Sequence, residues 1–151
     1  MYYFLPEDYK RLNDEITDIN NRIAEVGKEM GESCKEGAET FHDNFAYEDG
    51  ERQQFMLSTR LRKLIGIRNN ARITNSVNDR IVSIGKTITV IDDENVEHVY
   101  KIGSYLTFTN DDSSISYNCP LARILVGAKI GESRSGKIGH STRTYRIKNI
   151  T

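Results

Sequence analysis

Two carboxylates, an imidazole and three aromatic rings are concentrated in residues 37–47, and these residue types suit metal and phosphate chemistry. Glu39 and Asp43 are four residues apart, so on a helical turn they share one face. Two carboxylates about 6 Å apart repel by roughly 0.7 kcal/mol in water, which is tolerable at an exposed position and unfavourable in a core. A divalent cation reverses the sign, because Mg²⁺ prefers carboxylate oxygens and usually takes one or two of them from a protein, with phosphates and waters. The stretch therefore predicts an exposed acidic pair suited to Mg²⁺.

The other polar and aromatic residues of this stretch are candidates for supporting roles. His42 is placed to steer a water molecule or donate to a phosphate, although an exposed histidine is usually incidental. Asn44 is a residue type that favours helix caps. Phe41, Phe45 and Tyr47 are better suited to packing that makes the turn rigid than to stacking on bases.

Two arms with a helical pattern flank this stretch. In the first arm, apolar residues recur at alternating spacings of four and three, which is the a/d seam of a heptad repeat. These residues are Leu12, Ile16, Ile19, Ile23, Val26 and Met30. The second arm continues the spacing at Leu57, Leu61 and Leu64, with Tyr47 and Gln54 in register before them. Because the stretch between the arms is short, the helices should run antiparallel, with residues 37–47 at the tip.

After residues 69–79, which are rich in Asn, Ser and Thr and are typical of a linker, the apolar period changes to two. Residues 87–91 and 96–102 alternate in this way and flank the turn-forming residues 92–95, a pattern that predicts a β-hairpin. Further strands are predicted at residues 104–108, 115–117 and 144–148.

One short helix is predicted at residues 120–127, with Pro120 at its start and Gly127 just past its end. The predicted fold class is therefore α+β. An N-terminal antiparallel α-helical coiled-coil hairpin with an acidic tip occupies residues 1–74. A small, mostly antiparallel sheet with one short helix occupies residues 75–151.

Composition excludes several kinds of site. The 151 residues carry a net charge of −1, which conceals a charge of −8 on residues 1–50 and +7 on residues 51–151. The two halves therefore offer differently charged surfaces to a partner.

Cys34 and Cys119 have no zinc-ligand spacing, so we expect no stable metal site of the chain's own. No segment approaches the length of a bilayer span, and we expect a soluble, cytoplasmic protein.

Residues 115–132, ISYNCPLARILVGAKIGE, resemble the C-terminal signature of the Gre factors (GreA/GreB) of bacterial transcription, with its ISY, SPLARALLG and KxxGD elements. Cys119 replaces the usual serine before the proline. Residues 82–90 resemble the strand with which this family's C-terminal domain begins, and residues 143–147 resemble its closing strand. The resemblance covers essentially the whole chain, and its Pro-Leu-Ala-Arg block is specific.

The resemblance implies a coiled-coil hairpin joined to a domain similar to FK506-binding proteins, without prolyl isomerase activity. In the Gre family, this second domain docks at the rim of the RNA polymerase secondary channel, and the hairpin enters the channel. Two acidic tip residues then help to hold a second Mg²⁺ and a water in the polymerase active site, where backtracked RNA is cleaved. The factor is not itself an enzyme and has no cofactor of its own. It shares Mg²⁺ with the polymerase and meets backtracked nascent RNA at the tip. The resemblance also implies a monomeric, cytoplasmic, bacterial and DNA-binding protein.

The family's tip motif runs roughly Gly-Asp-Leu-x-Glu-Asn-Ala-Glu-Tyr. Its Glu-Asn pair falls on Asp43 and Asn44, its tyrosine falls on Tyr47, and its leading aspartate falls on Thr40. The resemblance thus assigns the catalytic carboxylate role to Asp43 by position, and Glu39, next to Thr40, is the candidate for the second acid. The expected supporting residues of the tip are Thr40, His42, Asn44 and Tyr47.

The second domain carries the expected docking residues, which are Pro120, Leu121 and Arg123. It also carries a basic surface, for which solubility is the better explanation for each residue taken singly. Together the cations could meet an acidic polymerase rim or nascent RNA. They are Arg123, Lys129, Arg134, Lys137, Arg143, Arg146 and Lys148.

Two other functions are compatible with these residues. A protein that occupies the secondary channel without a competent acidic pair would inhibit the polymerase or regulate initiation. A non-catalytic interaction module would hold some other protein on the second domain. Of the three functions, we expect that of a factor that stimulates cleavage of backtracked RNA by RNA polymerase.

Overall fold

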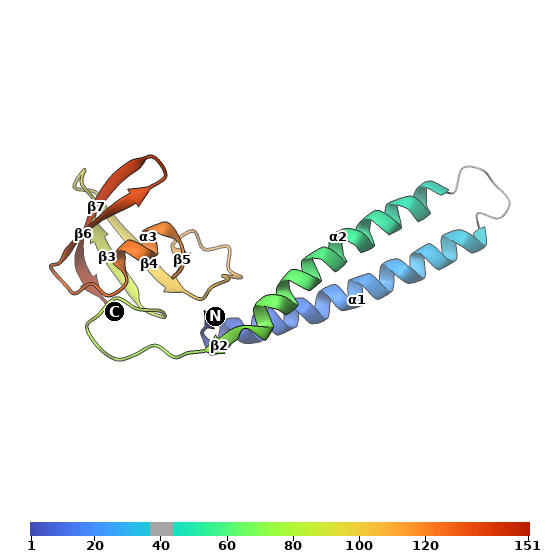
Figure 1. Ribbon diagram of the computed structural model, residues 1–151, viewed down its shortest axis with the longest axis horizontal. Helices are drawn as coiled ribbons and strands as arrows, with labels where there is room; N and C mark the ends of the chain where they lie inside the picture. Colours follow the sequence, from blue (N-terminus) through green and yellow to red (C-terminus); the bar gives the residue numbers. More distant parts are fainter. Residues whose placement is uncertain (37–43) are drawn as a thin grey trace. The chain divides into compact units, whose positions relative to one another are not determined.

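The computed structural model describes residues 1–36 and 44–151 (Figure 1). The chain divides into two compact units. The hairpin unit is Lys10–Asn70, and the sheet unit combines Met1–Tyr9 with Ala71–Thr151. This division differs from the sequence-based boundary between residues 74 and 75, because the first residues of the chain pair with a strand that follows the hairpin. No described helix is long and apolar enough to cross a membrane.

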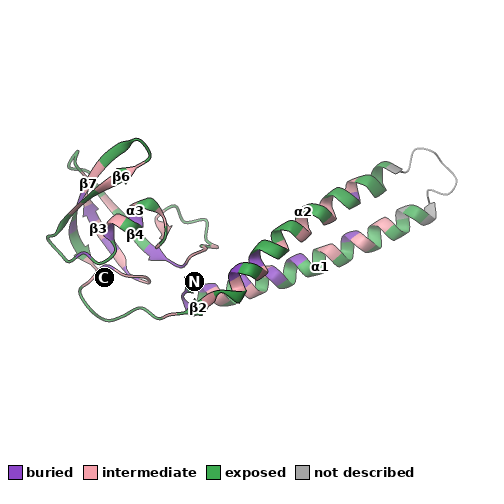
Figure 2. Ribbon diagram, viewed as in Figure 1, coloured by how far each residue is buried: buried purple, intermediate pink, exposed green. Residues whose placement is uncertain are grey.

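Two long helices, α1 (Pro6–Glu36) and α2 (Asn44–Asn69), supply the hairpin unit. Pro6 stands in the first turn of α1, where its missing N–H is not needed, and two acidic residues follow it near the positive end of the helix dipole. The Leu, Ile, Val and Met residues of the predicted seam are all buried or half-buried. Figure 2 shows buried positions alternating with exposed ones along α1. The buried seam residues are Leu12, Ile16, Ile19, Val26 and Leu64.

Contacts between the helices show that they run antiparallel. The Arg60 guanidinium (Nη2) donates to the Glu15 carboxylate (Oε1) at 3.1 Å. Further along α1, the Ile23 carbonyl accepts a hydrogen bond from the Gln54 side chain at 3.4 Å. Residue numbers rise along α1 as they fall along α2, so the predicted antiparallel coiled-coil hairpin is confirmed.

A five-stranded sheet in the order β5-β4-β3-β7-β6 forms the main part of the sheet unit. Neighbouring strands are antiparallel except β4 and β5, which are parallel. One short helix, α3 (Pro120–Leu125), accompanies the sheet, so the predicted α+β class is confirmed. The strands are β3 (Thr87–Ile91), β4 (Glu97–Gly103), β5 (Ser114–Ser116), β6 (Ser133–Ile138) and β7 (Ser141–Ile150).

The hydrophobic core of the sheet unit lies between α3 and one face of the sheet. Burial alternates along β3 as its sequence pattern predicts, with Ile88 and Val90 fully enclosed. Burying each such side chain stabilises the fold by about 1.5–3 kcal/mol. The other buried members of this core include Ile102, Ala122, Leu125, Tyr145 and Ile147.

Two three-residue strands, β1 (Tyr2–Phe4) and β2 (Ala71–Ile73), form a second, parallel sheet. The Thr74 N–H extends this pairing by donating to the Phe4 carbonyl at 2.8 Å. The sequence pattern places residues 69–79 in a linker and does not reveal these strands, because three residues are too few to show a period of two.

The predicted strand at residues 104–108 is wrong, because the structure has no strand there. The backbone of this segment is used to hold the N-terminus instead of extending a ladder. The Tyr105 N–H donates to the Tyr3 carbonyl at 3.0 Å, and the Ser104 side chain turns into the protein.

Ser104 is fully buried, and both hydrogen-bonding functions of its hydroxyl are used. Its oxygen accepts from the Leu5 N–H at 2.8 Å, and its proton is donated to the Asp8 carboxylate at 2.6 Å. The hydroxyl therefore ties the first turn of α1 to the end of β4 through polar groups that are shielded from water.

The change Ser104→Ala should lower the free energy of unfolding of the sheet unit by about 1–3 kcal/mol, because it removes the acceptor of the Leu5 N–H and one donor to the Asp8 carboxylate. Urea unfolding followed by tyrosine fluorescence measures this, since seven of the eight tyrosines, all but Tyr47, lie in this unit. Ser141→Ala, at an exposed serine on β7, is the matched control and should change the stability by less than about 0.5 kcal/mol. Equal stabilities of the two variants would contradict the expectation.

The turn between β3 and β4 is organised by one carboxylate. One oxygen of Asp92 accepts from the N–H groups of Glu94 (2.9 Å) and Val96 (2.8 Å), and the other lies 2.8 Å from Nε2 of His98. These contacts, that of His98 first, hold the pKa of Asp92 below its ordinary value of 3.8. Asn95 supplies the positive φ of 62° that the turn requires.

Because the pKa of Asp92 is lower in the folded state, its carboxylate stabilises the fold above pH 3.8. This contribution is lost as the pH falls from about that value through the lower folded-state pKa. Asp92→Asn should therefore be less stable than the unchanged chain at neutral pH, and its stability should fall less steeply in acid. Thermal unfolding across this pH range tests the expectation, with Asp112→Asn in an exposed loop as the control. Parallel curves for the unchanged chain and Asp92→Asn would contradict it.

Candidate functional site

The centre of the predicted acidic tip is not among the residues that the structure describes. Four predicted tip residues lie outside the described ranges: Glu39, Thr40, His42 and Asp43. Their assigned roles stay predictions. Asn44 is the first residue of α2, and Tyr47 follows within the first turns of that helix with 37% of its surface exposed.

In the second turn of α2, the hairpin unit is closely packed at Gly50, and Asp49 precedes it in the chain. A Cβ atom at Gly50 would lie 2.4 Å from Cγ of Met30, so a larger residue here would force the Met30 side chain to move. Asp49 accepts hydrogen bonds from Gln53 at 2.8 Å and from Arg52. These contacts, that of Gln53 first, lower the pKa of Asp49 and keep it negative.

Within residues 1–36 and 44–151, no group of three or more His, Cys, Asp or Glu side chains could hold a metal ion. The donor chemistry suited to Mg²⁺ is that of the two carboxylates inferred from sequence, which are hard oxygen ligands. Two carboxylates complete a Mg²⁺ site only with ligands from elsewhere, such as phosphates, waters or a partner's side chains.

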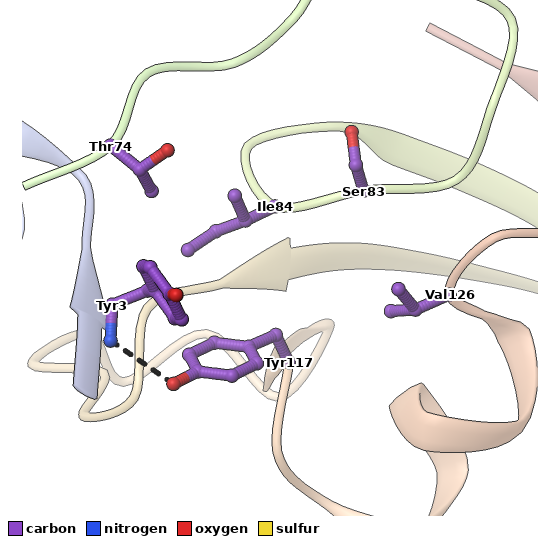
Figure 3. Close-up of a pocket in the computed structure, with 6 residues that line it drawn as sticks. All are labelled: Tyr3, Thr74, Ser83, Ile84, Tyr117 and Val126. Carbon is purple, nitrogen blue, oxygen red and sulfur yellow. Dashed lines mark hydrogen bonds between the residues drawn. The ribbon is translucent and has the colours of Figure 1, made fainter. Parts of the chain in front are cut away.

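An apolar pocket of about 210 Å³ opens on the sheet unit (Figure 3). At one side the Tyr3 and Tyr117 rings meet edge to face, with centroids 5.9 Å apart. The Tyr117 hydroxyl accepts a hydrogen bond from the Tyr3 backbone N–H at 3.0 Å, which ties the Tyr117 side chain to β1. Tyr3 and Val126 are 42% and 37% exposed, so the pocket offers apolar surface to a partner. Its lining residues are Tyr3, Thr74, Ser83, Ile84, Tyr117 and Val126.

None of these lining residues was predicted as part of a site, because five separate segments of the chain supply them. Tyr3 and Tyr117 are 114 positions apart. The one available signal was the run of three aromatic residues at positions 2–4, shortly before the mostly polar residues 6–11.

The three docking residues predicted from sequence lie on α3, and two of them are exposed. Pro120 and Arg123 are on the surface, whereas Leu121 is half-buried against the core. The Arg123 guanidinium donates twice to the Asn118 side-chain oxygen, at 2.7 and 3.1 Å, which orients the side chain. Val126 follows α3 directly and lines the pocket, so α3 leads into the pocket wall.

The predicted basic surface divides between two places. Arg123 belongs to α3 and Lys129 follows that helix, whereas the other five cations lie on β6 and β7. The structure therefore gathers most of this surface on one hairpin.

Comparison with known proteins places this arrangement in a family. Residues 77–151 match the family model described as "Transcription elongation factor, GreA/GreB, C-term". The chain belongs to the Gre family. It is 25% identical to transcription elongation factor GreA of Thermosipho melanesiensis, over 98% of this chain and 95% of that protein. It is 27% identical to the GreA of Mycolicibacterium vanbaalenii, over 85% of this chain and 80% of that protein.

Among solved structures, the GreA factor homolog 1 (Gfh1) protein of Thermus thermophilus is 18% identical with a TM-score of 0.46. The match covers 99% of this chain and 97% of that one.

The part of the chain that matches the Gre-family model contains α3 and the whole five-stranded sheet. Four pocket residues lie inside it, and the other two, Tyr3 and Thr74, come from outside. The similarity to the GreA of Thermosipho melanesiensis extends over 98% of the chain, so it includes the hairpin unit. The similarity to Gre-family proteins therefore covers both units of the chain.

Proposed function

We propose that this Gre-family elongation factor binds RNA polymerase through the sheet unit and carries the tip of the hairpin unit through the secondary channel. There it stimulates the polymerase's own cleavage of backtracked RNA. The observation that carries the proposal is the match of residues 77–151 to the GreA/GreB model. The acidic stretch at the reversal of the hairpin supports the cleavage role, and the names of the curated relatives support a role in elongation.

In this proposal, the chain contributes ligands and position, and the polymerase contributes the reaction. Asp43 and Glu39 would supply carboxylate oxygens that help to hold a second Mg²⁺ and a water in the polymerase active site. The two metal ions there would together provide a nucleophilic water and neutralise the leaving oxygen. The apolar seam and the close helix contact at Gly50 hold the two arms together just before the tip. The factor is therefore not an enzyme by itself.

The docking surface in this proposal is the apolar pocket together with the exposed end of α3. Tyr3 and Val126 offer apolar area, and the Arg123 guanidinium, oriented by Asn118, offers a cation on α3. A buried apolar anchor beside an arginine is the usual composition of an energetic centre in a protein interface.

Changing Glu39→Ala and Asp43→Ala together should reduce RNA cleavage in stalled polymerase complexes by on the order of 100-fold, the usual effect of losing a group that stabilises developing charge. Cleavage is measured as shortening of labelled transcripts. The matched control is Glu48→Ala with Glu51→Ala, two exposed carboxylates on α2 that give the same change in charge.

An equal loss of RNA cleavage in the control would show that the loss comes from the change in total charge and not from removal of the proposed Mg²⁺ ligands. If the unchanged chain slows synthesis without shortening transcripts, it is a channel-binding inhibitor. If it does not associate with polymerase at all, it is an interaction module for another protein.

Val126→Glu should weaken binding to purified bacterial RNA polymerase by about tenfold or more, because it places a charge in the apolar pocket. A direct titration with labelled factor measures the affinity. Val99→Glu is the matched control, since Val99 is an exposed valine on β4, away from the pocket. Comparable affinities of the two variants would show that the pocket is not the docking surface.

A further inference from the structure

The hairpin formed by β6 and β7, residues 133–150, is the most one-sidedly charged element of the sheet unit. We call it the basic ribbon. It contains five Lys or Arg residues and one histidine, and it contains no Asp or Glu. The whole chain has a net charge of −1, so this segment differs sharply from the average. Its Lys and Arg residues are Arg134, Lys137, Arg143, Arg146 and Lys148, and its histidine is His140.

Part of the basic ribbon is a two-stranded structure. β6 pairs with β7 from Ser133↔Arg146 to Ile138↔Ser141, whereas β3 pairs with β7 only from Arg146 to Ile150. The turn half of the ribbon therefore extends beyond the end of β3, as Figure 1 shows. Its two-residue turn has φ of +64° at Gly139, the first loop position, where a type II′ hairpin requires glycine.

One face of the basic ribbon presents only hydrogen-bond donors and small hydroxyl groups. The cross-strand pairs on this face are Lys137↔Thr142, Ser135↔Thr144 and Ser133↔Arg146. The hydroxyls of Ser135 and Thr144 lie 2.8 Å apart and join the strands between the two cations. From the strand rise, Lys137 and Arg146 stand about 14 Å apart along the ribbon.

The two cations of this face are available for a partner. Among the described residues, Lys137 and Arg146 have no ion pair and both are exposed. The Lys148 ammonium lies 2.8 Å from the Glu97 carboxylate, but both side chains are about half exposed, so the pair is weak and easily exchanged.

The opposite face holds the basic ribbon in place. A Cβ atom at Gly136 would lie 2.6 Å from Cγ1 of Ile124 on α3, so the helix packs directly on the ribbon backbone. Tyr145, which pairs with Arg134, is buried in the core. The exposed face is therefore presented on a rigid support, which lowers the entropic cost of binding.

We propose that the basic ribbon binds the phosphate backbone of duplex nucleic acid. Lysine, arginine, serine and threonine are the side chains that donate hydrogen bonds to phosphate oxygens. The exposed face has no aromatic ring on which an unpaired base could stack, which favours a duplex over a single strand. A two-stranded β-ribbon also has the width that the major groove of DNA admits. This binding is independent of base sequence and of RNA polymerase.

Fluorescence anisotropy with a short labelled DNA duplex and the full chain tests the proposal. The unchanged chain should bind at low salt, with an affinity that falls as salt rises from about 50 to 200 mM. Lys137→Ala with Arg146→Ala should bind about tenfold more weakly. If each cation neutralises one phosphate, the slope of log K against log salt should shrink by about 1.8. Lys137→Arg with Arg146→Lys should keep most of the affinity.

The control is Arg62→Ala with Lys63→Ala, two exposed cations on α2 that give the same change in charge. It should leave the binding unchanged, and tyrosine circular dichroism checks that each variant is folded. No binding by the unchanged chain, or an equal loss in the control, would overturn the proposal. Equal affinity for the matching single strand would also overturn it. Equal competition by polyglutamate would assign the ribbon to an acidic protein surface instead.

Discussion

The narrow apolar seam between α1 and α2 is the interaction on which the rest of the structure depends. Outside the seam, both helices are largely polar, and long polar helices in water gain most of their stability from a packed partner. Five predicted seam positions are buried, and polar contacts such as Glu15 to Arg60 set the register. The seam therefore determines where the chain reverses, and with it where any carboxylate at the reversal is held.

The sheet unit uses a different kind of constraint. Its core is an ordinary apolar layer between α3 and the sheet, but its N-terminal segment is held by polar groups, with Ser104 at the centre. The pocket and the basic ribbon are separate features on this frame, one apolar and one cationic. The two units thus have different roles in the function that we propose. The hairpin unit carries the predicted acidic tip, and the sheet unit carries the binding surfaces.

Much of this organisation could be predicted from the sequence, because it depends on periodicity. The heptad spacing of the seam, the alternation in β3 and the Pro120 to Gly127 helix signals each correspond to an observed element. β1 and β2 could not be predicted, because they are short and pair across the whole hairpin. The segment at residues 104–108 has the composition of a strand, but its backbone and Ser104 are committed to the N-terminus.

The candidate site was predictable only in part, for a related reason. Residue type and spacing identified Glu39 and Asp43 as possible ligands, but how two side chains converge depends on the exact course of the turn. The pocket escaped prediction because Tyr3 and Tyr117 come together only through the tertiary fold. Pro120 and Arg123 could be proposed as docking residues from the sequence because a short contiguous motif carries them.

The strand pairing of Tyr2–Phe4 with Ala71–Ile73 has a consequence for how the protein is made. During synthesis, β1 leaves the ribosome first, but it has no partner until the complete hairpin has followed it. Closing a long flexible loop is entropically costly, and a hairpin that has already formed brings the two strands together and removes much of that cost. Helix pairing should therefore precede completion of the sheet unit, and a substitution in the seam should delay the maturation of the sheet unit, in which it does not lie.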